Sequence, residues 1–313
     1  MDGRVVVALG GNAMTAPDGR ARPADQLAAV TRAAGPIAAV VAAGTSVLVT
    51  HGNGPQVGNL LVKNEIAASV VPPVPLDWCG AQTQGTIGLL LLDALDAALA
   101  ARSLAVPVAA LVTRTLVDAT DPGFAAPTKP IGRYLPRDQA ELMIGHGQVW
   151  RDTGRRGWRR VVASPEPLEV LDAPAAAVLL DAGYLVVAGG GGGVPVVREP
   201  GTGALRGVPA VVDKDLTAVL LARAVRAGVL VIATDVPAVA LDWGTPSARA
   251  LAAVDAATLR GYARAGAFAA GSMGPKVEAA CRFVEGGGRR AVITSLDRIA
   301  DAVTGTAGTV VTR

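Results

Sequence analysis

Three adjacent charged residues, Asp213, Lys214 and Asp215, stand between an apolar run and the start of an apolar helical pattern. The chain has 29 lysines and arginines, of which only four are lysines: Lys63, Lys129, Lys214 and Lys276. Since arginine supplies nearly all of the positive charge, a lysine is expected where a compact point charge is needed, such as between phosphate oxygens. We therefore predict that Lys214 and Lys276, with Lys129 as a third candidate, are brought to an anionic group. The alternative is that Asp213 caps a helix and Lys214 faces water.

Glycine-rich turns follow the apolar runs that we expect to be strands. Residues 4–9 lead into a Gly-Gly-Asn turn at 10–12, and residues 46–50 lead into His-Gly-Asn-Gly at 51–54, where a proline then suits the first turn of a helix. Glycine lets the backbone approach a ligand, and the free N–H groups of a helix N-terminus face an anion. Five glycines at 189–193 indicate either an anion nest or a very close crossing of two chain segments.

These features favour phosphate handling over other chemistry. The sequence lacks a P-loop and a protein-kinase catalytic loop. The glycines that follow residues 46–50 form a loose dinucleotide fingerprint, but the acidic residue expected at the end of the next strand is missing, which argues against a nicotinamide dehydrogenase. His51 is either a base or, as is commoner beside a strand end, a structural residue. Asp235 either binds Mg²⁺ or a ribose, or caps the following turn.

The composition indicates a soluble α/β protein. Hydrophobic residues make up 51% of the chain and aromatic residues 3%, so the core consists of Ala, Val and Leu, as in parallel sheets buried on both faces. The longest apolar runs are interrupted by polar or acidic residues and do not give the ~20 apolar residues that a bilayer needs. The first residues show no signal-peptide pattern. We therefore expect a cytoplasmic protein without a membrane or nucleic-acid partner.

Two smaller features are read as structural. The dense basic cluster from Arg155 to Arg160 is weak evidence for nucleic acid and is expected to be a solvated surface hairpin. The two cysteines, Cys79 and Cys281, make neither a disulfide framework nor a metal pattern and are expected to be buried.

Strand and helix patterns alternate along the chain, which predicts a mainly parallel sheet between helix layers with the site at the carboxyl ends of the strands. A stretch at 118–157, rich in proline and charge, is expected to be an exposed inserted subdomain that carries Lys129. A rigid proline loop is expected at 72–79. The expected strands are 4–9, 46–50, 106–113, 184–188, 229–233 and 291–294, with an edge strand at 305–311, and the expected helices are 26–43, 56–66, 82–102, 173–182, 216–227, 255–264, 277–285 and 296–303.

Several segments, taken together and in order from residue 4 to about 311, resemble carbamate kinase, a member of the amino acid kinase superfamily. The segments that carry the resemblance are Val7–Ala13, Thr50–Asn59, Pro75–Gly80, Thr128–Gly132, Arg159–Pro165, Gly189–Gly193, Val212–Asp215 and Gly271–Glu278. Two positions depart from the family pattern. Ala240 stands where many relatives have an aromatic residue near the adenine, and Arg133-Tyr134 follows Lys-Pro-Ile-Gly where a proline and an aromatic residue are usual.

The resemblance implies a fold and an activity. The fold is a three-layer αβα sandwich with a central, mainly parallel sheet and a small protruding subdomain, and the protein is a homodimer. Residues 1–225 form the lobe that binds carbamate or carbamoyl phosphate, and residues 226–313 form the nucleotide-binding lobe. The enzyme interconverts carbamoyl phosphate plus ADP with carbamate plus ATP, with Mg²⁺ carried by the nucleotide, and in many relatives it forms ATP in arginine-type catabolism.

The resemblance also implies roles for residues. Lys214 and Lys276 bracket the transferring phosphoryl group, and Asp215 orients both lysines. Because carbamate is already an oxyanion nucleophile, no general base is required, and the chemistry consists of positioning and charge neutralisation. The remaining contacts are assigned to substrate and phosphate (Gly10, Gly11, Asn12, Gly52, Asn53, Gly54 and Lys129) and to the nucleotide (Asp235, Ala240, Trp243, Met273 and Lys276).

Two other functions remain open. One is a relative with the same fold that phosphorylates another carboxylate, a phosphonate or a phosphate monoester. Carbamate needs a tiny polar pocket, with which the rigid proline loop is compatible. The other is a catalytically silent nucleotide-binding protein.

Overall fold

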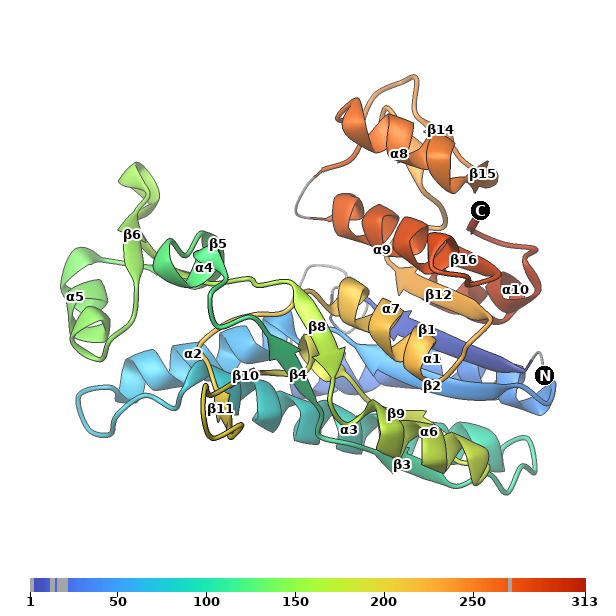
Figure 1. Cartoon of the computed structure of the whole chain (residues 1–313), viewed down its shortest axis with the longest axis horizontal. Helices are drawn as coiled ribbons and strands as arrows, with labels where there is room; N and C mark the ends of the chain where they lie inside the picture. Colours follow the sequence, from blue (N-terminus) through green and yellow to red (C-terminus); the bar gives the residue numbers. More distant parts are fainter. Residues whose placement is uncertain (1–2, 12–14, 16–21, 270–271) are drawn as a thin grey trace.

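The computed structural model describes residues 3–11, 15, 22–269 and 272–313. Within these residues the main sheet has eight strands. In spatial order they are β15 (Ala253–Asp255), β17 (Thr309–Thr312), β16 (Arg290–Ser295), β12 (Val229–Thr234), β1 (Arg4–Leu9), β2 (Ser46–His51), β9 (Leu185–Val187) and β3 (Val108–Ala110). The strands from β16 to β3 are parallel to their neighbours, while β17 runs antiparallel to β16 (Figure 1). The prediction of a mainly parallel sheet is confirmed.

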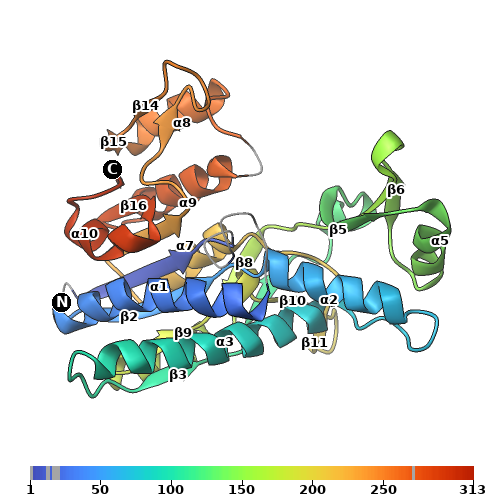
Figure 2. The ribbon, with the colours of Figure 1, turned by 180° about the vertical axis from the view of Figure 1, so that it is seen from behind.

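Two helix layers cover the sheet because successive strand side chains point to opposite faces. In β1, Val6 and Ala8 belong to one hydrophobic core, while Val5, Val7 and Leu9 belong to the other. The first core includes residues of α6 (Ala173–Asp181), α7 (Lys214–Ala224), α8 (Ala256–Arg264) and α9 (Met273–Glu285). The second includes residues of α1 (Pro23–Ala42), α3 (Leu76–Ala100) and α10 (Ile299–Thr304), and α1 and α3 lie side by side (Figure 2). The three-layer αβα sandwich is therefore confirmed.

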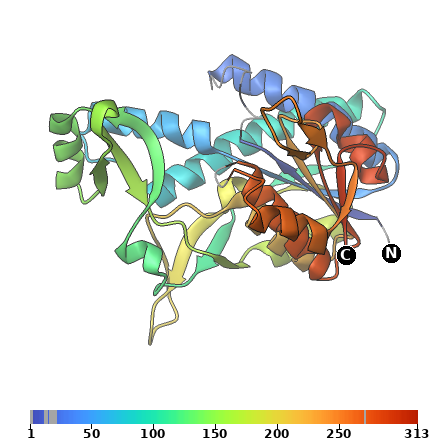
Figure 3. The same ribbon diagram turned by 90° about the horizontal axis from the view of Figure 1, so that it is seen from above.

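Smaller sheets lie outside this sandwich. One has the order β11 (Leu205–Gly207), β10 (Val194–Arg198), β4 (Arg114–Val117) and β8 (Pro167–Val170). Another pairs β13 (Ala240–Leu241) with β14 (Arg249–Ala250). The third has the order β5 (Lys129–Leu135), β7 (Trp158–Val162) and β6 (Trp150–Asp152), and with α5 (Arg137–Gly145) it stands at one end of the molecule (Figure 3).

The remaining elements are connections. α2 (Gly54–Ala67) runs from the end of β2 towards the third sheet, where it contacts β5 (Figure 1). The short elements are α4 (Pro122–Ala125) and the 3₁₀ turns η2 (Gly154–Arg156), η3 (Gly190–Gly192) and η4 (Leu296–Arg298).

Several predicted elements differ from the structure. The strand expected at 106–113 is observed only at Val108–Ala110, because its partner β9 ends at Val187, whose carbonyl accepts from the Leu111 N–H at 2.9 Å. Further on, the Gln84 side chain bonds both the N–H (2.8 Å) and the carbonyl (3.1 Å) of Thr113, and the chain turns into β4. The proline loop ends at Pro75, and the following helix begins at Leu76 rather than at residue 82. The C-terminal strand is not an edge strand, since β17 lies between β16 and β15.

The basic cluster from Arg155 to Arg160 and helix α3 both contain buried residues. The basic cluster is not uniformly solvated, because Arg160 on β7 is 7% exposed and its burial lowers the pKa of its guanidinium to about 10. Helix α3 is long and apolar enough to cross a membrane by length and composition. In this fold it packs against α1 and contributes Ile87, Leu91 and Leu95 to the second core.

Candidate active site

Two lysines from different parts of the chain meet at one carboxylate. Lys214 Nζ donates to Asp215 Oδ1 at 2.5 Å, and Lys276 Nζ donates to Asp215 Oδ2 at 3.3 Å. The Asp215 side chain is 4% exposed, while those of Lys214 and Lys276 are 17% and 13% exposed. Both carboxylate oxygens are therefore used, and the two ammonium groups converge on one small region.

Burial and charge act in opposite directions on the members of this cluster. Burial by itself would raise the pKa of Asp215, but the charges and hydrogen bonds of Lys214 and Lys276 hold it below its ordinary value. The pKa of Lys276 is lowered, first by burial and then by repulsion from Lys214, and Asp215 opposes both effects. Asp215 contacts both ammonium groups and the Asp213 carboxylate also acts on Lys276, so the positive charge is concentrated at the two Nζ atoms, where an anion would be attracted.

The sequence around Lys214 explains why its side chain reaches this position. Asp213 Oδ1 accepts hydrogen bonds from the N–H groups of Asp215 (2.9 Å) and Leu216 (3.1 Å), so Asp213 caps α7. Because the cap uses the N–H groups of Asp215 and Leu216, these N–H groups cannot bind an anion. The ammonium group of Lys214, in the same turn, is the group that can. Asp213 therefore caps a helix, as the alternative interpretation of the sequence had it. Lys214 does not face water as that alternative proposed, because its side chain is largely buried against Asp215.

The ends of β1 and β2 close around Lys214. A Cβ on Gly52 would lie 2.7 Å from the Cα and N of Gly11 and 3.2 Å from Cδ of Lys214, so glycine is required there by space. The Gly10 N–H donates to the Ala233 carbonyl (2.7 Å) and the Gly52 N–H to the Leu9 carbonyl (2.9 Å). Both N–H groups are therefore used in hydrogen bonds that extend the sheet, and they are not free to bind an anion as predicted.

The other residues predicted to bind phosphate are placed less closely. Gly54 begins α2, and Asn53 is its N-cap residue. The Asn53 side chain is not a cap, since its Nδ2 donates to Thr83 Oγ1 at 2.9 Å. Asn12 lies outside the described residues. Gly11, Asn53 and Gly54 remain the backbone candidates beside the lysines.

The five-glycine run is a close chain crossing rather than an anion nest. A Cβ at Gly190 would lie 2.3 Å from His51 Nε2, and one at Gly191 would lie 2.1 Å from Asn53 Nδ2. A Cβ at Gly193 would lie 2.1 Å from Thr115 Oγ1. The run is glycine for two reasons: neighbouring atoms leave no room for a Cβ, and every residue of the run except Gly190 has a positive φ, between 66° and 91°, which L side chains rarely adopt.

His51 is a structural residue. It is buried, and its Nδ1 lies 3.0 Å from the Gly52 carbonyl, which can only accept, so Nδ1 carries the proton. Burial lowers the pKa of His51 to about 4, against the hydrogen bond to Gly52, which raises it. The ring is neutral near pH 7 and holds the end of β2.

Lys129 lies on a separate cleft. Its Nζ donates to Ser164 Oγ at 3.4 Å, and Ser164 Oγ donates to the Val211 carbonyl at 2.9 Å. The cleft has a volume of about 1410 Å³ and is lined by Lys129, by Asn53 and Gly54, and by residues of α2, α3 and β5. The lysine pair on Asp215 is not part of the lining, although Val212 is. The structure therefore joins Lys214, Lys276 and Asp215 directly, and Lys129 only through Ser164 and Val211.

The cleft carries positive charge that the sequence reading missed. The described residues that line it include five basic side chains and no acidic one: Arg22, Lys63, Lys129, Arg133 and Arg159. Such a surface attracts an anionic ligand. Arg159 belongs to the cluster that was expected to be a solvated hairpin, Arg133 was noted only as a departure from the family pattern, and Lys63 was visible as one of four lysines.

The predicted nucleotide residues lie in the C-terminal part of the chain. Met273 and Lys276 share the first turns of α9, and Asp235 follows β12 with its Oδ1 accepting from Thr234 Oγ1 at 3.0 Å. Ala240 is part of β13, while Trp243 is 69% exposed.

Comparison with known proteins places the chain. Residues 3–295 match the amino acid kinase family. The carbamate kinase of Thermococcus kodakarensis is 45% identical, and the alignment covers 99% of each chain. The crystal structure of carbamate kinase from Giardia lamblia bound to AMP-PNP superposes with a TM-score of 0.92 at 39% identity, covering 99% of this chain and 98% of that one. A second structure of the Giardia enzyme, thiocarbamoylated by disulfiram on a cysteine, has a TM-score of 0.89 at 39% identity and covers 99% of each chain. The chain belongs to the amino acid kinase family and, within it, to the carbamate kinase group.

Proposed function

We propose that the protein is a carbamate kinase that transfers a phosphoryl group between carbamoyl phosphate and ADP. The observation that carries the proposal is the convergence of Lys214 and Lys276 on buried Asp215 beside the ends of β1 and β2. Full-length similarity to carbamate kinases supports the same conclusion.

The chemistry needs little beyond this arrangement. In the direction of ATP formation, the bond between phosphorus and the carbamoyl oxygen breaks, and a bond forms between phosphorus and a terminal oxygen of ADP. Carbamate leaves as an anion, so no residue has to supply or remove a proton. Lys214 and Lys276 compensate the charge on the transferring group, and Asp215 keeps the two ammonium groups in register before the substrate arrives.

Lys129 has a different place in this proposal. It lies on the basic cleft, where it would meet the carbamoyl end, and Gly11, Asn53 and Gly54 would contact substrate oxygens. Asp235, Ala240, Trp243 and Met273 would meet the nucleotide. The substrate lobe at 1–225 with its protruding subdomain, and the nucleotide lobe at 226–313, are part of the same proposal.

Mg²⁺ would enter with the nucleotide. Among the described residues no group of three or more His, Cys, Asp or Glu side chains could hold a metal ion. Both oxygens of Asp215 already bond lysines, which leaves Asp235, the carboxylate directly after the central strand β12, as the candidate ligand. One carboxylate plus phosphate oxygens is a donor set that Mg²⁺ accepts. When bound, the ion would neutralise charge on the nucleotide phosphates.

The test is ATP formation from carbamoyl phosphate and ADP with Mg²⁺, followed in a coupled assay. ATP formation in arginine-type catabolism, a cytoplasmic location and a homodimeric assembly complete the proposal. Sedimentation of the purified protein tests the dimer.

A second candidate keeps the fold and changes the acceptor. The observation that favours it is the cleft volume of about 1410 Å³, which is not the tiny pocket expected for carbamate. A screen of carboxylate, phosphonate and phosphate acceptors with ATP, read by ADP release, decides between the two. A larger acceptor that is turned over faster than carbamate would replace the first proposal.

A further inference from the structure

The segment at 163–166 is a junction between the approaches to Lys129 and Lys214. Ala163 bridges to Ala210, and its carbonyl accepts from the Val211 N–H at 3.0 Å, shortly before the Asp213 cap. Ser164 accepts from Lys129 and donates to the Val211 carbonyl. The proposed roles make no use of this segment, although the sequence around it is part of the family resemblance.

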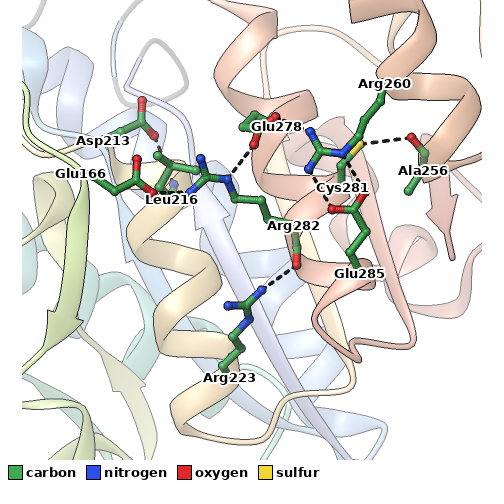
Figure 4. Close-up of polar contacts among 10 residues, drawn as sticks. All are labelled: Glu166, Asp213, Leu216, Arg223, Ala256, Arg260, Glu278, Cys281, Arg282 and Glu285. Atoms are coloured by element: carbon green, nitrogen blue, oxygen red, sulfur yellow. Dashed lines mark hydrogen bonds and ion pairs between the residues drawn. The ribbon is translucent and has the colours of Figure 1, made fainter.

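Glu166 joins the same segment to the helix that carries Lys276. Arg282 Nη1 donates to Glu166 Oε1, and Lys276 lies six residues earlier on α9 (Figure 4). Arg282 makes two other contacts: its Nε donates to Glu278 Oε1 at 2.6 Å, and its backbone carbonyl accepts from Arg223 Nη2 at 2.7 Å. The guanidinium is therefore shared between Glu166 and Glu278, and the backbone of α9 at Arg282 is tied to α7.

The network continues across the C-terminal layer. Glu278 also accepts from Arg260 Nη1 at 2.8 Å, and Arg260 donates to both carboxylate oxygens of Glu285 at 2.6 and 2.8 Å (Figure 4). Glu166 is thus bonded to a charge network that spans α8 and α9 rather than to one free side chain.

The Glu166–Arg282 contact is poorly suited to stabilising the fold. The side chains of Arg282 and Glu166 are 39% and 49% exposed, and exposed ion pairs contribute little to stability. The Glu166–Arg282 contact instead sets a geometry, because it connects α9 to the segment at 163–166. That segment bonds Lys129 and pairs with the chain just before Lys214. In a phosphoryl-transfer site, a misplacement of about 1 Å can cost ~10² in rate.

We propose that Glu166 and Arg282 are positioning residues that fix the placement of Lys276 relative to Lys129 and Lys214. The kinetic consequence rests on the proposed phosphotransferase function, whereas the structural coupling between the lysines does not.

A double-mutant cycle tests the kinetic consequence. Glu166→Ala, Arg282→Gln and the double variant are compared with Glu169→Ala, a matched control on β8 whose exposed carboxylate makes no ion pair with a described residue. We expect kcat for ATP formation to fall about 10-fold in each single variant, with KM changed less than about twofold and Tm by less than about 2 °C. The double variant should match Arg282→Gln, because Arg282→Gln already removes the Glu166 contact together with the Glu278 contact. Multiplying losses, or an equal loss in Glu169→Ala, would overturn the proposal.

Lysine NMR tests the coupling without any substrate. Labelling with [¹³Cε,¹⁵Nζ]-lysine gives signals from four side chains, because the sequence has four lysines. Glu166→Ala should shift the Lys129 and Lys276 signals, Arg282→Gln should shift Lys129 across the junction, and Lys63 should stay unmoved. Unmoved Lys129 and Lys276 signals in both variants would contradict the proposal. If the wild type forms no ATP from carbamoyl phosphate, the proposed function fails and these signals decide the coupling alone.

Discussion

Asp215→Asn is the most informative single change at the proposed site. It removes the one carboxylate that both lysines contact and leaves their two ammonium groups facing each other in a mostly buried place. Losing one partner of a buried ion pair costs about 3–5 kcal/mol, because the remaining charge is no longer compensated. The site can relieve this cost by releasing a proton from a lysine, and Lys276 is the candidate since burial and Lys214 already lower its pKa.

The expected effect on catalysis follows from that proton loss. One charge contact in such a site is worth about 10²–10³ in kcat, so Asp215→Asn should lose at least that factor at neutral pH. Because the lysine has to be protonated and its pKa falls further in the variant, activity should recover partly as the pH is lowered. The measurement is kcat for ATP formation between pH 5.5 and 9, with circular dichroism to confirm the fold.

Asp213→Asn is the matched control. It removes the same charge two residues away, and asparagine is as good an N-cap as aspartate, so α7 keeps its cap. Its kcat should stay within a few-fold of the wild type. The reasoning fails if Asp215→Asn keeps kcat within about fivefold and its pH optimum does not move.

Three further predictions concern other residues. Lys214→Ala and Lys276→Ala should each lower kcat by about 10²–10³ with the fold intact, and near-normal ATP formation in either variant would show that the role of that lysine is wrong. The pKa of His51 falls from 6.5 to about 4 on folding, so between these pH values the unfolded chain binds a proton that the folded chain lacks. The free energy of unfolding should therefore drop by up to about 3 kcal/mol as the pH falls through this window. Urea titrations should show less of this drop in His51→Gln and all of it in His146→Gln, which changes an exposed histidine. Both thiols are buried, and burial raises the pKa of Cys79 and raises that of Cys281 to about 11. Disulfiram should therefore leave the native protein active, and mass spectrometry should detect no adduct. An adduct on either cysteine in the folded state would contradict this.

Local patterns predicted the inner strands of the main sheet closely. β1 matches the predicted strand at 4–9, and β2 and β12 each extend one residue beyond the predicted end. These strands are buried on both faces, so their apolar runs are continuous and turn residues mark their ends.

The strands further from the centre were predicted less well. β15 was not predicted, and β17 begins at Thr309 rather than at residue 305. The strand expected at 106–113 was too long because its pairing stops where β9 ends at Val187. A limit set by the partner strand has no signature in the strand itself.

The glycine turns show a second limit of sequence reading. A glycine is required both where a backbone approaches a ligand and where two chain segments cross, and composition does not separate these causes. At 189–193 the neighbours include His51, Asn53 and Thr115, so the causes are packing and, at every position except Gly190, a positive φ. At Gly10 and Gly52 the amides complete the sheet.

The sequence by itself determined the alternation of strands and helices and the choice of Lys214 and Lys276 as candidates. Each of these depends on residues near one another in the chain or on the scarcity of lysine. The resemblance implied that Asp215 orients both lysines, and the tertiary structure shows both contacts. Tertiary structure alone decided between the alternatives for Asp213, which caps α7, and placed Lys129 apart on a basic cleft and Glu166 against Arg282. The physical reason is that charge interactions depend on distance and burial, and residues 129, 164, 214 and 276 acquire both only when the sheets and α9 have packed.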